Sequence, residues 1–126
     1  MFEKEKIKLF GNQPVPKITN AELEFLINRE FSKNKDIVQR KLAEIQSDSQ
    51  NGKNRICAAI LKLAKSDLNK IDFLINKVKE DFRDIISEAE YPRAFTYGFE
   101  LPNEKELKTI YLNDWNEYLE WKNKGK

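Results

Sequence analysis

The sequence predicts a mostly α-helical protein, a single domain of five helices organised on a long helical hairpin. Residues 55–90 hold the longest stretch in which apolar residues recur every three or four positions, which is the spacing of one face of a helix. The composition agrees, because 40% hydrophobic and 35% charged residues with only four glycines and four prolines are typical of a soluble helical protein. A chain of 126 residues can bury one core without disulfides or metal ions, so we expect one domain over residues 1–126.

Two apolar stripes predict the two helices of the hairpin. The first stripe predicts a helix over residues 54–65, and the second predicts a helix over residues 68–90. Ser66 and Asp67 lie between them and supply polar oxygens that can cap the start of the second helix. The pattern leaves open whether the second helix is continuous or kinked near residues 80–81.

Two shorter helices are predicted before the hairpin. Thr19 and Glu22 have the spacing of a capping box, in which each side chain bonds the backbone N–H of the other residue. They open a helix predicted over residues 20–32. Asp36, with a glutamine three residues later, repeats this spacing at the start of a helix predicted over residues 36–46.

The remaining segments are predicted to be a loop and two extended arms. Residues 47–54 form a loop by composition, and residues 1–18 form an N-terminal arm with a polar–apolar alternation over residues 5–10. A second arm, residues 94–101 (94–102 with the proline that ends it), alternates aromatic residues with small or polar ones. The two arms could pair as a two-stranded ribbon, or the second arm could lie alone across the helices.

The last predicted helix, residues 103–122, has an unusually wide apolar surface. Asn103 and Glu106 cap its start, and its apolar residues span about 200° of its circumference, where docking on one neighbour needs roughly 100°. The middle of this arc, which the rest of the domain should cover, holds Tyr111, Trp115 and Tyr118, and its flanks hold Ile110 with Trp121 and Leu112 with Leu119. We predict that the flanks are an interaction surface for a second copy or a protein partner, unless the 94–101 arm covers one of them.

The residue types present exclude several kinds of chemistry. The chain has no histidine, which removes the commonest general base and rules out Ser–His and Cys–His nucleophile pairs. The single cysteine, Cys57, is too few for a Cys/His zinc site and lies in an apolar helical segment, so we predict a structural thiol. No glycine-rich phosphate-binding loop of a familiar type is present. The first hypothesis is therefore a non-catalytic protein-interaction module without a cofactor.

A second hypothesis is a small DNA-binding regulator. Two short helices joined by a three-residue turn, residues 20–32 and 36–46, could form a helix-turn-helix unit, with Arg40 and Lys41 reaching the major groove. Against this, residues 20–46, the two helices with their turn, carry equal numbers of acidic and basic residues, whereas phosphate contacts need a positive face. Nucleic-acid binding is accordingly not the expected function.

A third hypothesis is an enzyme of unfamiliar type built on charged residues at the end of the long helix. Asp84 and Glu88 are four residues apart on one helix face and could bind a hard cation with water. The alternative is structural, with a capping D-x-x-D at a kink and ordinary ion pairs. The cluster consists of Asp81, Arg83, Asp84, Glu88, Glu90 and Arg93.

Net charge and hydropathy limit the kinds of partner and the cellular location that we expect. The net charge of +2 implies no polyanionic partner by itself, and a local basic excess at Lys53, Arg55, Lys62 and Lys65 is predicted to be a solvated face. No apolar stretch approaches the roughly 20 residues that span a bilayer, and no signal-like segment follows the charged start. We expect a cytoplasmic protein that does not bind membranes.

Residues 58–93, AAILKLAKSDLNKIDFLINKVKEDFRDIISEAEYPR, carry a family resemblance. The segment resembles one in small uncharacterised bacterial proteins with an LKLA-x-GD run, a D-[WF]-RD run and an AEYP ending. Ser66 stands where that pattern has glycine, and Phe82 stands where tryptophan is expected. The resemblance implies a bacterial protein of the cytosol, and it implies no particular activity.

Overall fold

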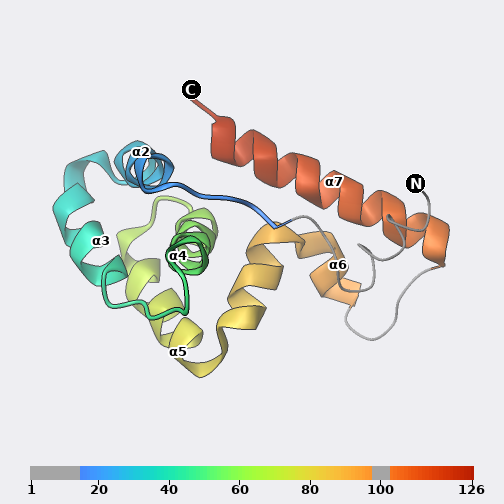
Figure 1. Cartoon of the computed structure of the whole chain (residues 1–126), viewed down its shortest axis with the longest axis horizontal. Coiled ribbons are helices and arrows are strands. Elements are labelled where there is room, and N and C mark those ends of the chain that lie inside the picture. Colours follow the sequence, from blue (N-terminus) through green and yellow to red (C-terminus); the bar gives the residue numbers. More distant parts are fainter. Residues whose placement is uncertain (1–14, 98–102) are drawn as a thin grey trace.

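The computed structural model describes residues 15–97 and 103–126, and within these ranges every regular element is helical (Figure 1). The mostly α-helical fold is thus confirmed. The helices are α2 (Asn20–Glu30), the 3-10 turn η2 (Ser32–Asn34), α3 (Lys35–Leu42), α4 (Gln50–Ala64), α5 (Leu68–Glu90), α6 (Pro92–Tyr97) and α7 (Glu104–Asn123). The predicted arm over residues 5–10, and with it any ribbon that the arm would form, lies outside the described residues.

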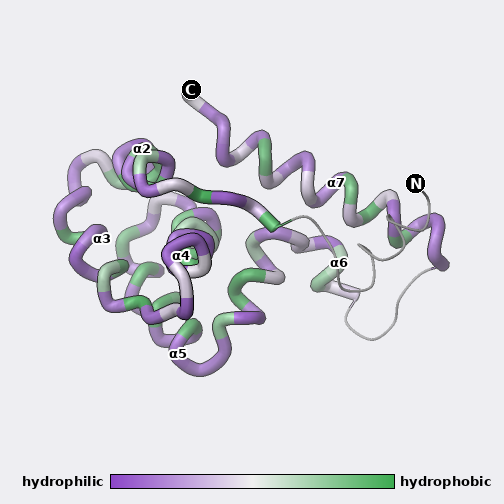
Figure 2. The backbone as a smooth tube through the Cα atoms, in the orientation of Figure 1, coloured by the Kyte–Doolittle hydropathy of each residue, from purple (hydrophilic) through white to green (hydrophobic). Residues whose placement is uncertain are grey.

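Helix α4 is the centre of the hydrophobic core. It packs against α5 along the hairpin and against α2 on another side, while α3 packs on α5 (Figure 1). Small residues at Ala58, Ala59 and Ala64 have no exposed surface, which lets the neighbouring helices approach α4 closely. Figure 2 shows hydrophobic residues recurring along α5 and α7 between hydrophilic ones, as an amphipathic helix requires.

The hairpin has the cap and the kink that its sequence suggested. Asp67 is the N-cap of α5, and its carboxylate accepts a hydrogen bond of 3.0 Å from the N–H of Asn69. Lys65 and Ser66 make the turn with φ of 50° and 62°, in the left-handed region. At Asp81 the backbone leaves helical geometry (φ −158°, ψ 100°), and α5 changes direction there (Figure 1). The Asp81 carboxylate restarts the helix by accepting from the N–H of Arg83 at 3.0 Å.

Two helix starts differ from prediction. Helix α4 begins at Gln50, inside the predicted 47–54 loop, because Ser49 accepts a hydrogen bond from the N–H of Gly52 and caps it. Buried Asn54 anchors this first part by donating to the carbonyl of Ile18 at 2.9 Å. Helix α3 begins at Lys35 directly after η2 and has no side-chain cap at its N-terminus, so the predicted cap by Asp36 is wrong. The capping box of Thr19 at α2 is confirmed.

The predicted extended arm over residues 94–101 is wrong over its first part. Pro92–Tyr97 form helix α6, and residues 98–101 lie outside the described residues. The helix forms because the Asp114 carboxylate of α7 accepts from the N–H groups of Arg93 (3.2 Å) and Ala94 (3.1 Å), which caps α6 from another part of the chain. Asn103 caps α7 as predicted, accepting from the N–H of Glu106 at 2.9 Å.

Along the described residues, no helix combines the length and the apolar character that crossing a membrane requires.

Candidate functional site

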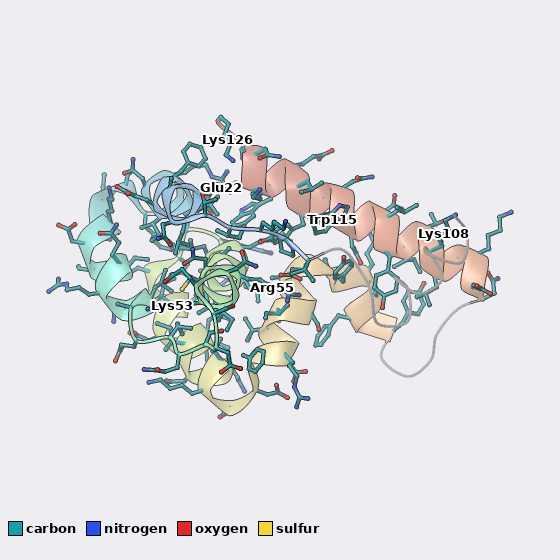
Figure 3. The ribbon with its side chains drawn as sticks, viewed as in Figure 1. Glu22, Lys53, Arg55, Lys108, Trp115 and Lys126 are labelled. Carbon is teal, nitrogen blue, oxygen red and sulfur yellow. The ribbon has the colours of Figure 1, made fainter. Side chains whose placement is uncertain are left out.

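The buried face of α7 is built on a row of aromatic rings. Leu107, Asp114 and Tyr118 are buried, and Tyr118 has no exposed surface. Trp115 stacks near Tyr118, with ring centroids 6.3 Å apart, and Tyr91 reaches Tyr111 at 5.0 Å in an edge-to-face contact. These rings hold the α5–α6 corner against α7 (Figure 3 shows Trp115 on the inner side of α7). The middle of the predicted apolar arc is thus occupied within the chain.

Trp121, a predicted interaction residue, packs partly against the core. The guanidinium of Arg29 lies 5.1 Å from its ring centroid and 5.8 Å from the ring of Phe25. Arg29 also donates to the carbonyls of Trp121 and Lys124, both at 2.7 Å, and so ties the end of α7 to α2. Lys122 pairs with Glu22 of α2 at 2.8 Å, and Lys126 pairs with the same carboxylate at 3.0 Å (Figure 3 labels Lys126 and Glu22). Much of the Trp121 ring therefore serves a contact inside the chain.

The other three predicted interaction residues lie on two sides of α7. Leu112 is 51% exposed, and Leu119, seven positions on and so on the same side, is half-buried. Ile110 is half-buried and lines an open cleft of about 500 Å³ together with Tyr97 of α6, whose exposed fraction is 44%. We call this the α6–α7 cleft, and its lining residues are Tyr97, Asn103, Lys105, Glu106, Thr109 and Ile110.

The predicted charged cluster at the end of α5 is divided by the kink and the helix turns. Arg83 bonds the Asp81 carboxylate through its Nε at 3.1 Å, and this pair faces solvent. Asp84 and Glu88 are exposed. Among the described residues, no three His, Cys, Asp or Glu side chains are placed to hold a metal ion together.

Glu90 belongs to a separate, buried ion pair. Its carboxylate has no exposed surface and receives two hydrogen bonds of 2.7 Å from the Nε and Nη2 of Arg55 on α4. Figure 3 places Arg55 between α4 and the last turns of α5. Burial raises the pKa of Glu90, and the Arg55 guanidinium opposes that rise. A bidentate pair of this kind is a structural link between α4 and α5.

Arg93 joins the α6 corner to α7 rather than to Asp84 or Glu88. Its guanidinium donates to the Asp114 carboxylate at 2.8 Å and to the Glu117 carboxylate at 2.6 Å. These two partners raise the pKa of Arg93. Four of the six residues proposed from sequence as one polar site are therefore divided among three ion-pair groups, and the other two, Asp84 and Glu88, are exposed.

Asp114, whose carboxylate caps α6 and pairs with Arg93, was not identified from the sequence. It lies seven positions after Leu107 and four before Tyr118, so it falls in the middle of the apolar arc of α7. A carboxylate on the buried face of a helix must accept hydrogen bonds from other buried groups. The position of Asp114 in the sequence could therefore have predicted that it organises polar contacts inside the core. Glu90 gave a similar signal, since it follows Ile86 by four positions on the buried face of α5.

The helix pair proposed for DNA binding uses one of its groove residues internally. Lys41 donates to the Asp72 carboxylate of α5 at 2.7 Å, whereas Arg40 is exposed and contacts the carbonyl of Asp36 through its Nε at 3.4 Å. Lys35 is also paired, with Glu24 at 3.3 Å. The basic side chains of this pair thus face acids as well as solvent.

No family model matches the chain, and no curated protein or solved structure is significantly similar to it.

Cys57 lies inside the core next to the end of α3. It is almost fully buried, and its Sγ lies 3.7 Å from the carbonyl oxygen of Leu42. Burial raises the pKa of the thiol to about 12. A thiol in this state is a poor nucleophile at neutral pH, which agrees with the structural role expected from the sequence.

Proposed function

We propose that this protein is a non-catalytic interaction module that associates with a second copy of itself through the α6–α7 cleft. The observation that carries the proposal is the pairing of Tyr97 and Ile110 in one open cleft, although they come from different helices. The sequence pattern also predicted Ile110 to lie on a flank of the apolar arc that the domain core does not need. A half-exposed tyrosine beside an aliphatic side chain offers large apolar area at low conformational cost.

The charges in the cleft favour a second copy as the occupant. Lys105 and Glu106 both line it, so the same surface presents one ammonium and one carboxylate. A two-fold axis brings the same patch of both subunits together, and a patch with one charge of each sign is then complementary to itself. Strongly acidic or basic partners would meet a like charge on one side of the cleft.

A matched pair of variants tests this. We expect the apparent mass of the wild-type protein in sedimentation velocity to rise with concentration, and the variant with Tyr97→Ser and Ile110→Ser to stay monomeric. Leu112→Ser is the control, because it removes an apolar side chain that is 51% exposed on another side of α7. This control should associate as the wild type does.

Circular dichroism checks that the double variant keeps its helices. If the wild-type protein stays monomeric across the concentration series, self-association is excluded and a foreign partner replaces it as the hypothesis. If Leu112→Ser abolishes association while the double variant does not, the α6–α7 cleft is not the interface.

A further inference from the structure

A second cleft lies at the other end of α7, where α2, α4 and α7 all reach their C-termini. It is open and has a volume of about 430 Å³. Three lysines line it, Lys62 and Lys65 from the end of α4 and Lys124 from the end of α7. Ser66, Glu30, Glu117 and the Trp121 ring complete the wall. We call it the lysine cleft.

The acids of this cleft are already neutralised by residues outside it. Glu30 is paired with Arg29 at 3.1 Å, and Glu117 is paired with Arg93 at 2.6 Å. Neither arginine lines the cleft. Glu117 still favours the charged form of Lys62 through its Coulomb attraction. The lining nevertheless holds three lysines against two carboxylates, each of which also bonds an arginine, so the cleft keeps an excess of positive charge.

The three lysines have no such partners. Within residues 15–97 and 103–126, no carboxylate lies within ion-pair distance of the ammonium groups of Lys62, Lys65 or Lys124. Lys62 is also half-buried, and this burial lowers its pKa. Lys65 lowers the pKa of Lys62 further, while Glu117 and Asp114 oppose that change. A bound anion would add to this partial compensation of like charges held close together.

The donors suit a phosphate group. Three ammonium groups can supply several hydrogen bonds, and a phosphate monoester offers up to two negative charges and three acceptor oxygens. The Ser66 hydroxyl, which donates to the Glu30 carboxylate at 3.4 Å, would have to turn away from Glu30 to join them. The volume is within the range of pockets that hold small organic molecules, so there is room for more than the phosphate itself. The Trp121 ring gives the organic part an apolar wall.

We propose that the lysine cleft binds a small phosphate monoester, with Lys62, Lys65 and Lys124 around the phosphate group. This site is separate from the α6–α7 cleft, so its test does not depend on self-association. The competing account is that the lysines only compensate the negative ends of the converging helices, in which case no anion should be selected.

Phenyl phosphate is a suitable probe, followed by backbone amide chemical shifts at pH 7.5. We expect a saturable titration whose shifts concentrate at residues 62–66 and at Lys124, and weaker binding of benzoate, which has the same ring and a carboxylate. Lys62→Gln with Lys65→Gln should weaken phenyl phosphate binding about tenfold or more, as loss of roughly 1.4 kcal/mol implies. Lys124→Gln should also weaken phenyl phosphate binding. Because Lys124 is exposed and follows α7, this change should leave the packing of the core intact.

Lys70→Gln with Lys79→Gln is the control, since it removes two charges from exposed positions on α5. It should leave binding unchanged. A linear titration without saturation, benzoate binding as tightly as phenyl phosphate, or an equal loss in the control would each overturn the proposal. Circular dichroism of every variant separates loss of binding from loss of fold.

Discussion

Replacing Arg55 by methionine is expected to destabilise the protein strongly at neutral pH and less at low pH. The change removes both hydrogen bonds of 2.7 Å to Glu90, whose side chain has no exposed surface. Methionine keeps much of the volume of the arginine stem, so the main effect is a buried carboxylate without its partner. Breaking a buried pair in this way costs about 3–5 kcal/mol, a large part of the roughly 5–15 kcal/mol that holds an ordinary domain folded.

The pH dependence follows from Glu90. Burial raises the pKa of Glu90 above its ordinary value of 4.5, and without Arg55 this burial is less opposed. The folded variant then binds a proton more readily than the unfolded chain does, so its stability falls as the pH rises from 4.5 through the raised pKa. We expect the destabilisation by Arg55→Met to be smaller at pH 5 than at pH 7.5.

Urea unfolding followed by circular dichroism at both pH values measures this. The variant with Arg55→Met and Glu90→Leu should recover much of the lost stability, because it leaves no buried charge. A cost below about 1 kcal/mol at pH 7.5, where breaking the pair is expected to cost about 3–5 kcal/mol, would refute the reasoning. So would a cost that is the same at pH 5 and pH 7.5.

Four further predictions concern single positions. Asp114→Ala removes the cap of α6 and should cost about 2–3 kcal/mol in urea unfolding, with a loss of helical circular dichroism. Ser66→Gly should stabilise the protein by about 0.5–1 kcal/mol, because glycine accepts the φ of 62° without strain, and an unchanged melting temperature would contradict this. Hydrogen bonds, first from Lys122 and then from Lys126 and the Thr19 backbone, lower the pKa of Glu22 from 4.5 to about 2. The stability that this carboxylate contributes should therefore be lost as the pH falls from 4.5 through 2, and Glu22→Gln should flatten that loss. Cys57 should react slowly with a thiol reagent in the native protein, and Cys57→Ala should cost roughly 1 kcal/mol, whereas rapid native labelling would show that the thiol is accessible.

Much of the secondary structure follows from the sequence alone, because its signals are local. The apolar spacing over residues 68–90 predicted α5 with its bounds, and Asp67 predicted its cap. The capping box of Thr19 likewise depends on a residue only three positions away. Helix periodicity and side-chain caps involve neighbours within one turn, so no knowledge of the tertiary structure is needed to infer them.

The tertiary structure decided the elements and contacts whose partners are distant in the chain. Residues 94–101 alternate like a strand, yet Pro92–Tyr97 are helical because Asp114, about 20 positions later, accepts hydrogen bonds from the first N–H groups of this helix. Glu90 is tolerated in the core only because Arg55, 35 positions earlier, lies across from it. The two clefts also join separate helices, and no local pattern could show that Tyr97 and Ile110 line the same cleft. Periodicity states which side of a helix is apolar, but only packing states which residues from other helices meet it there.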